Sequence, residues 1–431
     1  MEHMEHMEHM EHMEHMEHTR PLAAMAHRLM TCALPLAMLA ASSASADESL
    51  FRLSGFGTLG AVYHDARDVT FRRDISQVKG AEGGQFSLRP DSMLGVQLDA
   101  HLTDRLDAMV QLISRESADS DYTPEVSWAH FKYELDSNSS VRVGRMGLEF
   151  YLQGDSIEIG YANPMVRPQV IFYPRTFDGV DAETSFPLAG GAMRLKAMTG
   201  WTHGKLMSGQ GTFDTAGSPF LGGMVEYTRD GWTGRLSAGG LKLQRETSSP
   251  ELEAFRQALS AVPNGADILD TISMSNRRQK LLSFSLAYDD GPLQTQASYN
   301  VIASHAWPNR NIFYVNAGYR LERFTPYLGF CAMRMDRDTI PTGIPDGLSP
   351  GTDQLNAGAS VAQSMLKANQ DTWTAGVRYD LGGNLALKAQ VDLIRYIDPA
   401  SLIDAEQDMT PAGAREWKRA TVYSLALDFV F

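Results

Sequence analysis

The sequence has very few cysteines. Only Cys32 and Cys331 occur among its 431 residues, and Cys32 lies in a segment with the features of a cleavable leader. Without that leader the chain carries Cys331 alone, so no internal disulfide can form in an oxidising compartment. A fold held together by disulfides is therefore excluded.

Long apolar runs are also missing beyond the N-terminal region. A membrane-spanning helix needs about 20 mostly apolar residues, and the mean hydropathy of the chain is -0.25. The sequence thus argues against helical membrane spans. Its 37 glycines and 9% aromatic residues favour many strands joined by turns.

A net basic charge is absent as well. The chain has 52 acidic and 38 basic residues. Removing residues 1–46, which hold six Glu and two Arg, leaves 46 acidic and 36 basic residues, a net charge of -10. Nucleic acid is therefore excluded as an expected partner, because phosphate backbones are bound by basic surfaces.

The chain begins with two segments that are not expected to join the fold. Residues 1–24 contain a Met-Glu-His repeat and a leader extension, interpreted either as a His-rich metal-binding tract or, as we favour, as an extension upstream of the true start. Residues 25–46 have a basic start, an apolar stretch and an Ala44-Ser45-Ala46 cleavage site. They predict a signal peptide and export, leaving 47–431 as one domain.

From residue 47 onward the dominant signal is alternation of apolar and polar residues. Leu293 and Val301 share one face of their segment, whereas Gln294 and Ser298 share the other. A period of two is typical of strands with one apolar and one wet face. The pattern predicts sixteen strands, over 51–64, 86–102, 106–117, 125–135, 141–146, 177–186, 192–201, 221–228, 232–245, 279–288, 293–303, 311–321, 325–335, 372–381, 385–396 and 419–431.

The predicted connections alternate in length. Short turns rich in Asp, Gly, Asn and Ser suit tight hairpins at one end. Long connections are expected at the other end, over 65–85, 147–176, 202–220, 246–278, 336–371 and 397–418. This sorting predicts an all-β fold, a 16-stranded antiparallel transmembrane β-barrel with short periplasmic turns and long extracellular loops.

The last predicted strand ends at Phe431 and has an apolar face formed by residues such as Tyr423, Leu425 and Leu427. Left alone, it would present an unpaired edge and an apolar surface to water. We therefore expect it to pair with the first strand, 51–64, and to place its apolar face against lipid.

The third connection, 147–176, is too apolar and aromatic for an exposed loop tip, and Pro164, Pro168 and Pro174 stiffen it. We expect it to fold into the barrel and form a constriction. The predicted constriction residues are the loop acids Glu149, Asp155 and Glu158 and the wall bases Arg142, Arg145, Arg194, Lys196 and Arg235.

Two alternatives remain open for these residues. Opposed acids and bases would produce a field across the narrowest point, but any wet lumen carries mixed charges without a special role. Arg145 shares the parity of the lipid-facing Val143, so it would need a bulge or the strand end to turn inward.

Other segments carry weaker signals. Residues 249–262 predict a short surface helix, packed on the barrel mouth or on a neighbouring subunit. The Asp residues of 336–371 suggest either a calcium loop or, as we favour, a solvated acidic loop. A GxGxxG match at 55–60 lies within a strand pattern, so it does not indicate a dinucleotide site.

An enzyme is not expected. The His residues beyond the leader are scattered, and no GxSxG or HExxH arrangement occurs. We therefore predict no catalytic residue, no cofactor and no metal site.

Several segments in order resemble the 16-stranded porins of Gram-negative bacteria. They are "FRLSGFGTLGAV" in the first strand, "SVRVGR" before the third connection, "GYANPMVRP" within it, "FDGVDA" after it, "FTPY" in the thirteenth strand and the terminal "DFVF". The likeness extends from about Leu50 to Phe431 and is greatest to uncharacterised porin-like members.

This resemblance implies a homotrimer in the cell outer membrane, in contact with lipid and lipopolysaccharide. Phe431 resembles the terminal signal read by the outer-membrane assembly machinery. We predict a water-filled channel for passive diffusion of small hydrophilic solutes and ions. The alternatives are a surface receptor or adhesin with a plugged lumen, and a substrate-selective channel.

Overall fold

The structure is a computed structural model. It describes residues 50–66, 69–118, 121–167, 174–208, 211–245, 249–275, 277–304, 309–336, 338–364, 369–396, 405–407 and 419–431. The predicted repeat at 1–24 and signal peptide at 25–46 lie outside these residues, as does Pro168 of the third connection.

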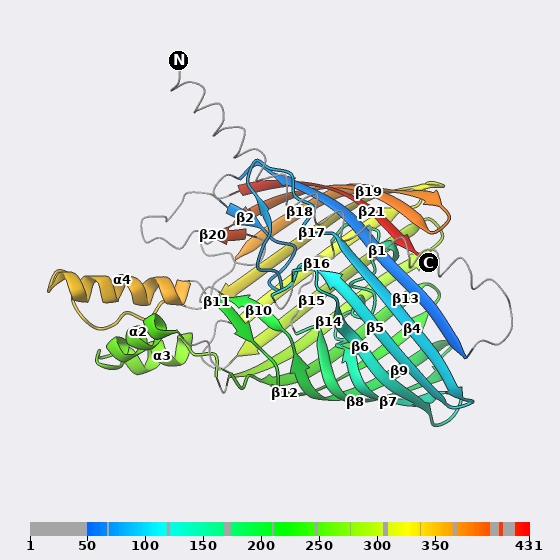
Figure 1. Cartoon of the computed structure of the whole chain (residues 1–431), viewed down its shortest axis with the longest axis horizontal. Helices are drawn as coiled ribbons and strands as arrows, with labels where there is room; N and C mark the ends of the chain where they lie inside the picture. Colours follow the sequence, from blue (N-terminus) through cyan, green and yellow to red (C-terminus); the bar gives the residue numbers. More distant parts are fainter. Residues whose placement is uncertain are drawn as a thin grey trace, which may run out of the picture.

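Sixteen antiparallel strands form one closed barrel (Figure 1). Strand β1 pairs with both β4 and β21, and this second pairing joins the two ends of the sheet. All sixteen predicted strands are confirmed. They are β1 (Phe51–His64), β4 (Met93–Thr103), β5 (Leu106–Arg115), β6 (Glu125–Glu134), β7 (Ser139–Gly147), β8 (Thr176–Leu188), β9 (Gly191–His203), β12 (Pro219–Arg229), β13 (Trp232–Lys242), β14 (Arg278–Asp290), β15 (Leu293–Ser304), β16 (Asn309–Tyr319), β17 (Phe324–Asp336), β18 (Gln370–Gly382), β19 (Leu385–Tyr396) and β21 (Arg419–Val430).

The alternation along each strand separates an apolar exterior from a polar interior. In β21, Tyr423 and Leu425 are exposed on the outside, whereas Ser424 and Asp428 are buried on the inside. The outer belt includes Leu98, Val110, Phe131, Val143, Val180, Leu221, Leu236, Leu282, Phe284, Phe313, Leu328, Trp373 and Leu393. Soluble monomers rarely expose apolar patches larger than roughly a few hundred Å², so this belt requires an apolar environment.

Tight turns connect strands at one end of the barrel. Asp230 and Gly231, between β12 and β13, have φ values of 48° and 78°. Two consecutive positive φ values match the twist of hairpin strands. Ala189, between β8 and β9, also has a positive φ value, 49°, which alanine rarely adopts.

Small elements occupy the long connections at the opposite end (Figure 1). Strands β2 (Val69–Phe71), β3 (Ala81–Glu82) and β20 (Ala405–Gln407) form one sheet, and β10 (Lys205–Ser208) pairs with β11 (Gly211–Asp214). The predicted strand over 86–102 is confirmed only from Met93 onward, where β4 begins, so its first part, 86–92, is wrong. Ser87 makes an isolated bridge to Val62, and Pro90 has no N–H to donate to a strand ladder.

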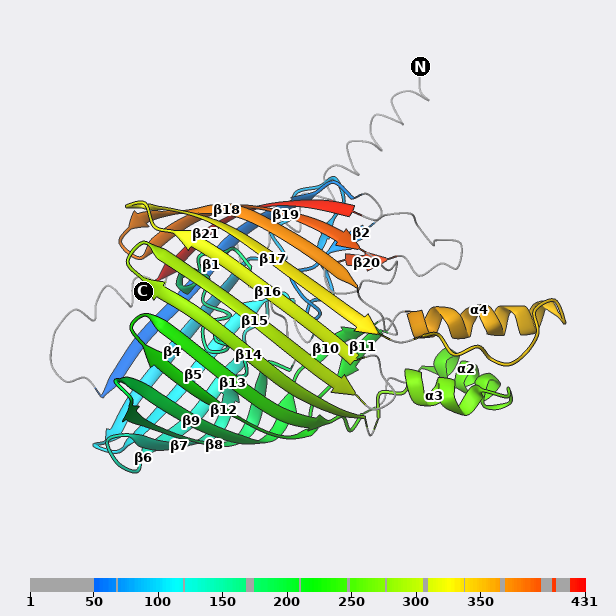
Figure 2. The same cartoon turned by 180° about the vertical axis from the view of Figure 1, so that it is seen from behind.

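Three helices extend beyond the long-connection end of the barrel (Figures 1 and 2). They are α2 (Pro250–Ser260), α3 (Gly265–Ile272) and α4 (Pro350–Ser364), and we call them the helical projection. The predicted helix at 249–262 is confirmed as α2, whose first turn is capped by Ser249. It packs on α3 and α4 around buried Leu259 and Ile268. The sequence interpretation of 336–371 as a solvated loop missed α4.

Within the described residues, no helix is both long enough and apolar enough to cross a lipid bilayer.

Candidate functional site

The described parts of the connection between β7 and β8 lie against the inside of the barrel wall, and we call these residues, 148–167 and 174–175, the inner loop. It contains the short 3-10 helix η1 (Gly160–Ala162). Near its start, the ring of Phe150 packs against Gly222 of β12 and Gly239 of β13. A Cβ atom on either glycine would lie 2.6 Å from that ring. The two glycines therefore provide the space that the inner loop occupies.

Glu149 joins the inner loop to three cations of the wall. Its carboxylate lies 2.9 Å from Arg142 Nη2 and 2.8 Å from Arg194 Nη2, and it also pairs with Lys196. Burial of the loop carboxyl acts to raise its pKa, but Lys196 and Arg142 outweigh burial and hold the pKa well below its usual range. Glu149 is therefore an ionised anchor for the loop.

Acids of the wall share the same cations. Asp181 lies 2.5 Å from Arg142, and Glu183 lies 2.6 Å from Arg194. Their positions follow from the strand register, which sets Arg142 opposite Asp181 and Glu183 opposite Lys196. Because these acids partly neutralise the bases, the cluster is not a simple opposition of loop acids and wall bases. The sequence interpretation missed both acids.

Arg235 anchors the next part of the inner loop. It lies opposite Glu226 in the register, and their side chains pair at 2.5 Å. A second guanidinium nitrogen of Arg235 donates to the backbone carbonyl of Tyr151. The four predicted wall bases Arg142, Arg194, Lys196 and Arg235 thus all contact the inner loop.

Asp155 differs from the other loop acids because its side chain is exposed within the barrel interior. It forms no hydrogen bond or ion pair with any residue that the structure describes. Its enclosed position, and then the Glu149 carboxylate, raise the pKa of Asp155 above its usual value. This loop carboxyl is therefore available to solutes in the interior.

Glu158 pairs with cations that the sequence interpretation did not identify. Its carboxylate lies 2.9 Å from Arg115 of β5 and also pairs with Arg175 at the end of the inner loop. Arg175 in turn lies 2.6 Å from Asp74, in the connection between β1 and β4. The parity of Arg115 with the inward Ile113 was the available sequence signal.

The structure corrects the predicted set of constriction residues at Arg145. It stays on the outer side of the wall with Val143, and its guanidinium pairs with Asp178 at 2.7 Å. The irregular Gly144, with φ at 136°, does not turn Arg145 inward. The parity rule therefore holds. Arg145 lies on the outer side of the wall, whereas the other seven predicted residues lie on its inner side or in the inner loop.

The far side of the inner loop is fastened to β19 and β21. Arg167 lies 2.5 Å from Asp91 and 2.6 Å from Asp392. Lys388 lies 2.7 Å from Asp428 and donates to the carbonyl of Gly160 at 2.7 Å. The sequence interpretation missed these anchors, although the inward parity of Lys388 and Asp392 was visible. The inner loop is thus bonded to opposite walls of the barrel.

Part of the inner wall is apolar, in contrast to the fully wet interior expected from the sequence. Leu281, Ile302, Ile312 and Met333 are buried on the inner faces of β14 to β17, toward the long-connection end. Met165 of the inner loop belongs to the same cluster. The loop therefore covers an apolar surface on this side.

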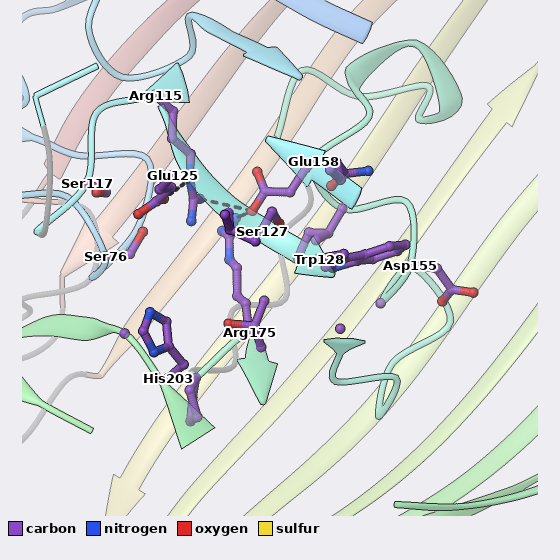
Figure 3. Close-up of a pocket in the computed structure, with 18 of the residues that line it drawn as sticks. Ser76, Arg115, Ser117, Glu125, Ser127, Trp128, Asp155, Glu158, Arg175 and His203 are labelled. Carbon is purple, nitrogen blue, oxygen red and sulfur yellow. Dashed lines mark hydrogen bonds and ion pairs between the residues drawn. The ribbon is translucent and has the colours of Figure 1, made fainter. Parts of the chain in front are cut away.

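A pocket remains between the inner loop and the wall formed by β5 and β6 (Figure 3). About 820 Å³ of the pocket is free of protein atoms, and part of this space is open solvent. Figure 3 shows Arg115, Glu125 and Arg175 near Glu158, with His203 and Asp155 on opposite sides in this view. The pocket offers cationic, anionic and aromatic contacts, the last from Trp128.

The described residues contain no group of three or more His, Cys, Asp or Glu side chains placed to hold a metal ion. In the acidic connection, Asp346 accepts a hydrogen bond from Asn356 and Asp353 accepts one from the backbone of Gly347. These two carboxylates thus serve local structure.

No protein-family model matches the sequence. No curated protein sequence is similar to it. Solved structures with a similar fold include the anion-selective porin from Comamonas acidovorans, with a TM-score of 0.52 and 13% identity over 88% of this chain and 99% of that chain. The outer membrane channel DcaP of Acinetobacter baumannii has a TM-score of 0.51 and 11% identity over 90% of this chain and 99% of that chain.

OmpT of Vibrio cholerae, solved in a trimer form, has a TM-score of 0.49 and 9% identity over 89% of this chain and 100% of that chain. At such low identities, a likeness establishes the fold alone. Together with the closed ring of strands, the similarity to the porin and to DcaP shows that the chain has a 16-stranded porin-like barrel.

Proposed function

We propose that the protein is an outer-membrane porin that forms a water-filled channel for passive diffusion of small hydrophilic solutes and ions. The apolar outer belt supports membrane insertion, since the closed ring leaves no unpaired strand edge to lipid. No catalytic step is part of the proposal.

The observation that carries the proposal is the solvent-open pocket inside the closed barrel. Ionisable side chains of the inner loop and of the wall line this pocket, including Glu158, Arg115 and Asp155. Charged groups in a narrow aqueous passage select ions through their field. A passage beside the inner loop is therefore the proposed route for solutes.

Conductance tests the proposal directly. Purified, folded protein in a planar bilayer should give stepwise current increments, in groups of three if the proposed homotrimer forms. Folding is checked by the shift in gel mobility on heating. A barrel that is folded and inserted in the bilayer, yet carries no current, would refute the channel.

We propose that Glu149, Asp155 and Glu158 and the bases Arg142, Arg194, Lys196 and Arg235 form the constriction. Asp155 is the best probe because it is exposed to the interior and carries no ion pair with a described residue. Asp155→Asn should lower the cation-to-anion permeability ratio, measured as the reversal potential across a salt gradient. An unchanged ratio would remove Asp155 from the route.

A surface receptor with a plugged lumen is the second candidate. The bonds of the inner loop to opposite walls favour it, as does the helical projection outside the barrel. A receptor would lose ligand binding when the helical projection is removed, and it would carry no current before or after. A porin would keep its conductance.

A further inference from the structure

One arginine of the inner wall has no acidic partner among the described residues. Arg310 of β16 shares its face of the strand with the buried, inward Ile312, whereas Phe313 points outward. Arg310 is half-buried, its Nε atom is buried, and it forms no hydrogen bond or ion pair with a residue that the structure describes. Other inward bases, such as Arg194 and Lys388, pair with carboxylates. Arg310 therefore keeps a charge that the described protein does not use.

The neighbours of Arg310 on the inner face are apolar. In the register it lies opposite Ile302 of β15 on one side and opposite Met335 of β17 on the other. Both neighbours are 7% exposed, and neither can neutralise a guanidinium. A charge in apolar surroundings is costly unless it is paired and hydrogen-bonded. An anion bound at Arg310 would lower this cost.

A second pocket lies on this side of the barrel, between the start of the inner loop and strands β9 and β12 to β15. About 330 Å³ of it is free of protein atoms, and part of this space is open solvent. Most of its lining is apolar, and we call it the apolar pocket. The apolar side chains that line it include Leu148, Phe150, Phe220, Leu241, Leu281 and Ile302. Sites for small molecules are commonly apolar, with a few polar groups that fix the orientation of the ligand.

Arg310 adjoins the apolar pocket on two sides. Ile302, directly opposite Arg310 in the register, lines the pocket. Tyr151 follows the lining residue Phe150 in the inner loop. Burial raises the pKa of the Tyr151 hydroxyl above its usual value, and the nearby Arg310 guanidinium acts against this rise. The guanidinium therefore lies close both to the wall and to the loop segment that enclose the pocket.

We propose that Arg310 and the apolar pocket bind a small carboxylate with an apolar body. The guanidinium pairs with the carboxylate, because its N–H donors match the geometry of two carboxylate oxygens. The apolar body lies against Leu281 and Ile302. This site rests on the proposed function, since solutes must reach the barrel interior, and it names a class of solute that the interior would hold.

The site lies toward the long-connection end of the barrel. Arg310 is the second residue of β16, and Ile302 is close to the end of β15. Strands β14, β15 and β16 lie side by side in Figure 2, with this end nearest the helical projection. In the proposed orientation a solute from outside the cell would meet the site before the ion pairs of Glu149.

The test measures binding to the full chain in neutral detergent micelles by isothermal titration calorimetry. The probe is hexanoate, which has both a carboxylate and an apolar body. Acetate keeps the carboxylate but lacks the body, and hexanamide keeps the body but lacks the charge. A titration of each compound into micelles alone is subtracted, and heat-dependent gel mobility checks that each variant is folded.

The wild type should bind hexanoate at least about 10-fold more tightly than acetate, because each methylene that leaves water contributes about a fourfold gain. It should bind hexanoate about 10-fold more tightly than hexanamide, as expected for a hydrogen bond to a charged group. Equal affinity for hexanoate and acetate would exclude the apolar pocket. Equal affinity for hexanoate and hexanamide would exclude Arg310. Either result overturns the proposal.

Arg310→Gln should weaken hexanoate binding by about 10-fold and leave hexanamide binding unchanged. The matched control is Arg278→Gln, which removes the same charge at the same end of the barrel from the outward face of β14. The control should change the affinity for hexanoate less than about twofold. Equal losses in the two variants would indicate only an effect of net charge and would refute the site, as would an unchanged affinity in Arg310→Gln.

A second pair of variants tests the apolar contact and does not depend on the folding of Arg310→Gln. Ile302→Thr replaces an apolar group in the pocket with a hydroxyl of similar shape, so it should weaken hexanoate binding by about fourfold or more. Val301→Thr, on the opposite face of β15, is the matched control and should have no effect. If Ile302→Thr weakens binding no more than Val301→Thr, the pocket does not hold the apolar body and the proposal fails.

Failure of this site and failure of the channel are distinguishable. A barrel that binds hexanoate through Arg310 but carries no current would refute the proposed channel and leave the site in place. A barrel that conducts but does not bind hexanoate would refute the site and leave the channel in place.

Discussion

At the scale of single residues, Glu149 is the best-defined electrostatic contact of the interior. Its side chain is 5% exposed and pairs with Arg142, Arg194 and Lys196. Removal of one partner from a buried ion network costs about 3 kcal/mol, because the remaining charges stay buried. Glu149→Gln should lower the free energy of unfolding by about that amount, measured by urea titration in lipid vesicles.

Asp178 provides the matched control for Glu149. It also pairs with an arginine, Arg145, but its side chain is 48% exposed on the outer wall. Exposed pairs contribute about 1 kcal/mol or less, so Asp178→Asn should change stability little. Equal effects of the two substitutions would contradict the anchoring role of Glu149.

Glu116 predicts a pH dependence of stability at the long-connection end. It lies just after β5, is buried, accepts a hydrogen bond from the backbone of Lys79 and pairs with Arg89 at 3.2 Å. Burial, and then the neighbouring Asp121 carboxyl, raise the pKa of Glu116 to about 7 from 4.5. Folded protein therefore keeps this proton over a pH range in which the unfolded chain releases it.

A raised pKa in the folded state gives stability that is complete below about pH 4.5 and lost as the pH rises through about 7. Glu116→Gln should flatten this part of the profile and stabilise the barrel at pH 8 relative to the wild type, by up to about 3 kcal/mol. Urea midpoints of the variant and the wild type at pH 4, 6 and 8 measure this difference in stability. A variant profile parallel to that of the wild type would contradict the assignment.

Parity along a strand could place many single residues, because a side chain two positions from a lumen residue also points inward. It correctly placed Arg194, Lys196 and Arg235, and it gave the reason that Arg145 stays outside. Partners such as Asp181 could not be predicted, since they depend on the register between strands. The fold of the inner loop also could not be predicted from a period-two pattern.

At the scale of elements, the missing side chain of Gly239 leaves room for the start of the inner loop. A side chain there would meet the ring of Phe150 at 2.6 Å, whereas one at the outward Gly240 would meet only a carbonyl oxygen at 3.8 Å. Gly239→Val should therefore displace the start of the inner loop and increase the single-channel conductance. Gly240→Val, the matched control, should leave conductance unchanged.

Limited proteolysis provides a second measurement for this pair. A displaced inner loop should be cleaved by trypsin after Arg175, whose guanidinium now pairs with Glu158 of the inner loop and with Asp74 of another loop. Wild-type conductance and wild-type protease resistance in Gly239→Val would show that the ring of Phe150 does not depend on this space.

The strands could be predicted from sequence because a membrane-like outer face demands alternation over their whole length. The two errors in the predicted elements have local causes. Residues 86–92 alternate like a strand, yet Pro90 interrupts the ladder just before β4. Helix α4 contains Gly351, Gly358 and several Ser and Thr residues, which are poor helix formers, and its packing on Leu259 is formed only with α2 and α3.

At the scale of the whole molecule, the helical projection and the barrel are separate packing units. The core of the projection combines Leu259 and Ile268 from one connection with Ala359 from another, 336–371. The barrel ladders include none of these residues. Removal of both parts, 249–275 and 338–364, each replaced by a short Gly-Ser linker, should therefore leave the barrel able to fold and conduct.

Removal of 338–364 alone should lower the refolding yield more than removal of both parts. The single deletion uncovers Leu259 and Ile268 and leaves their apolar surface in water. The fraction of protein that shows heat-dependent gel mobility after refolding measures this order. The double deletion should give the higher yield, with the wild-type conductance per channel. A lower yield from the double deletion would mean that the helices stabilise the barrel, and the two units would have to be treated as one.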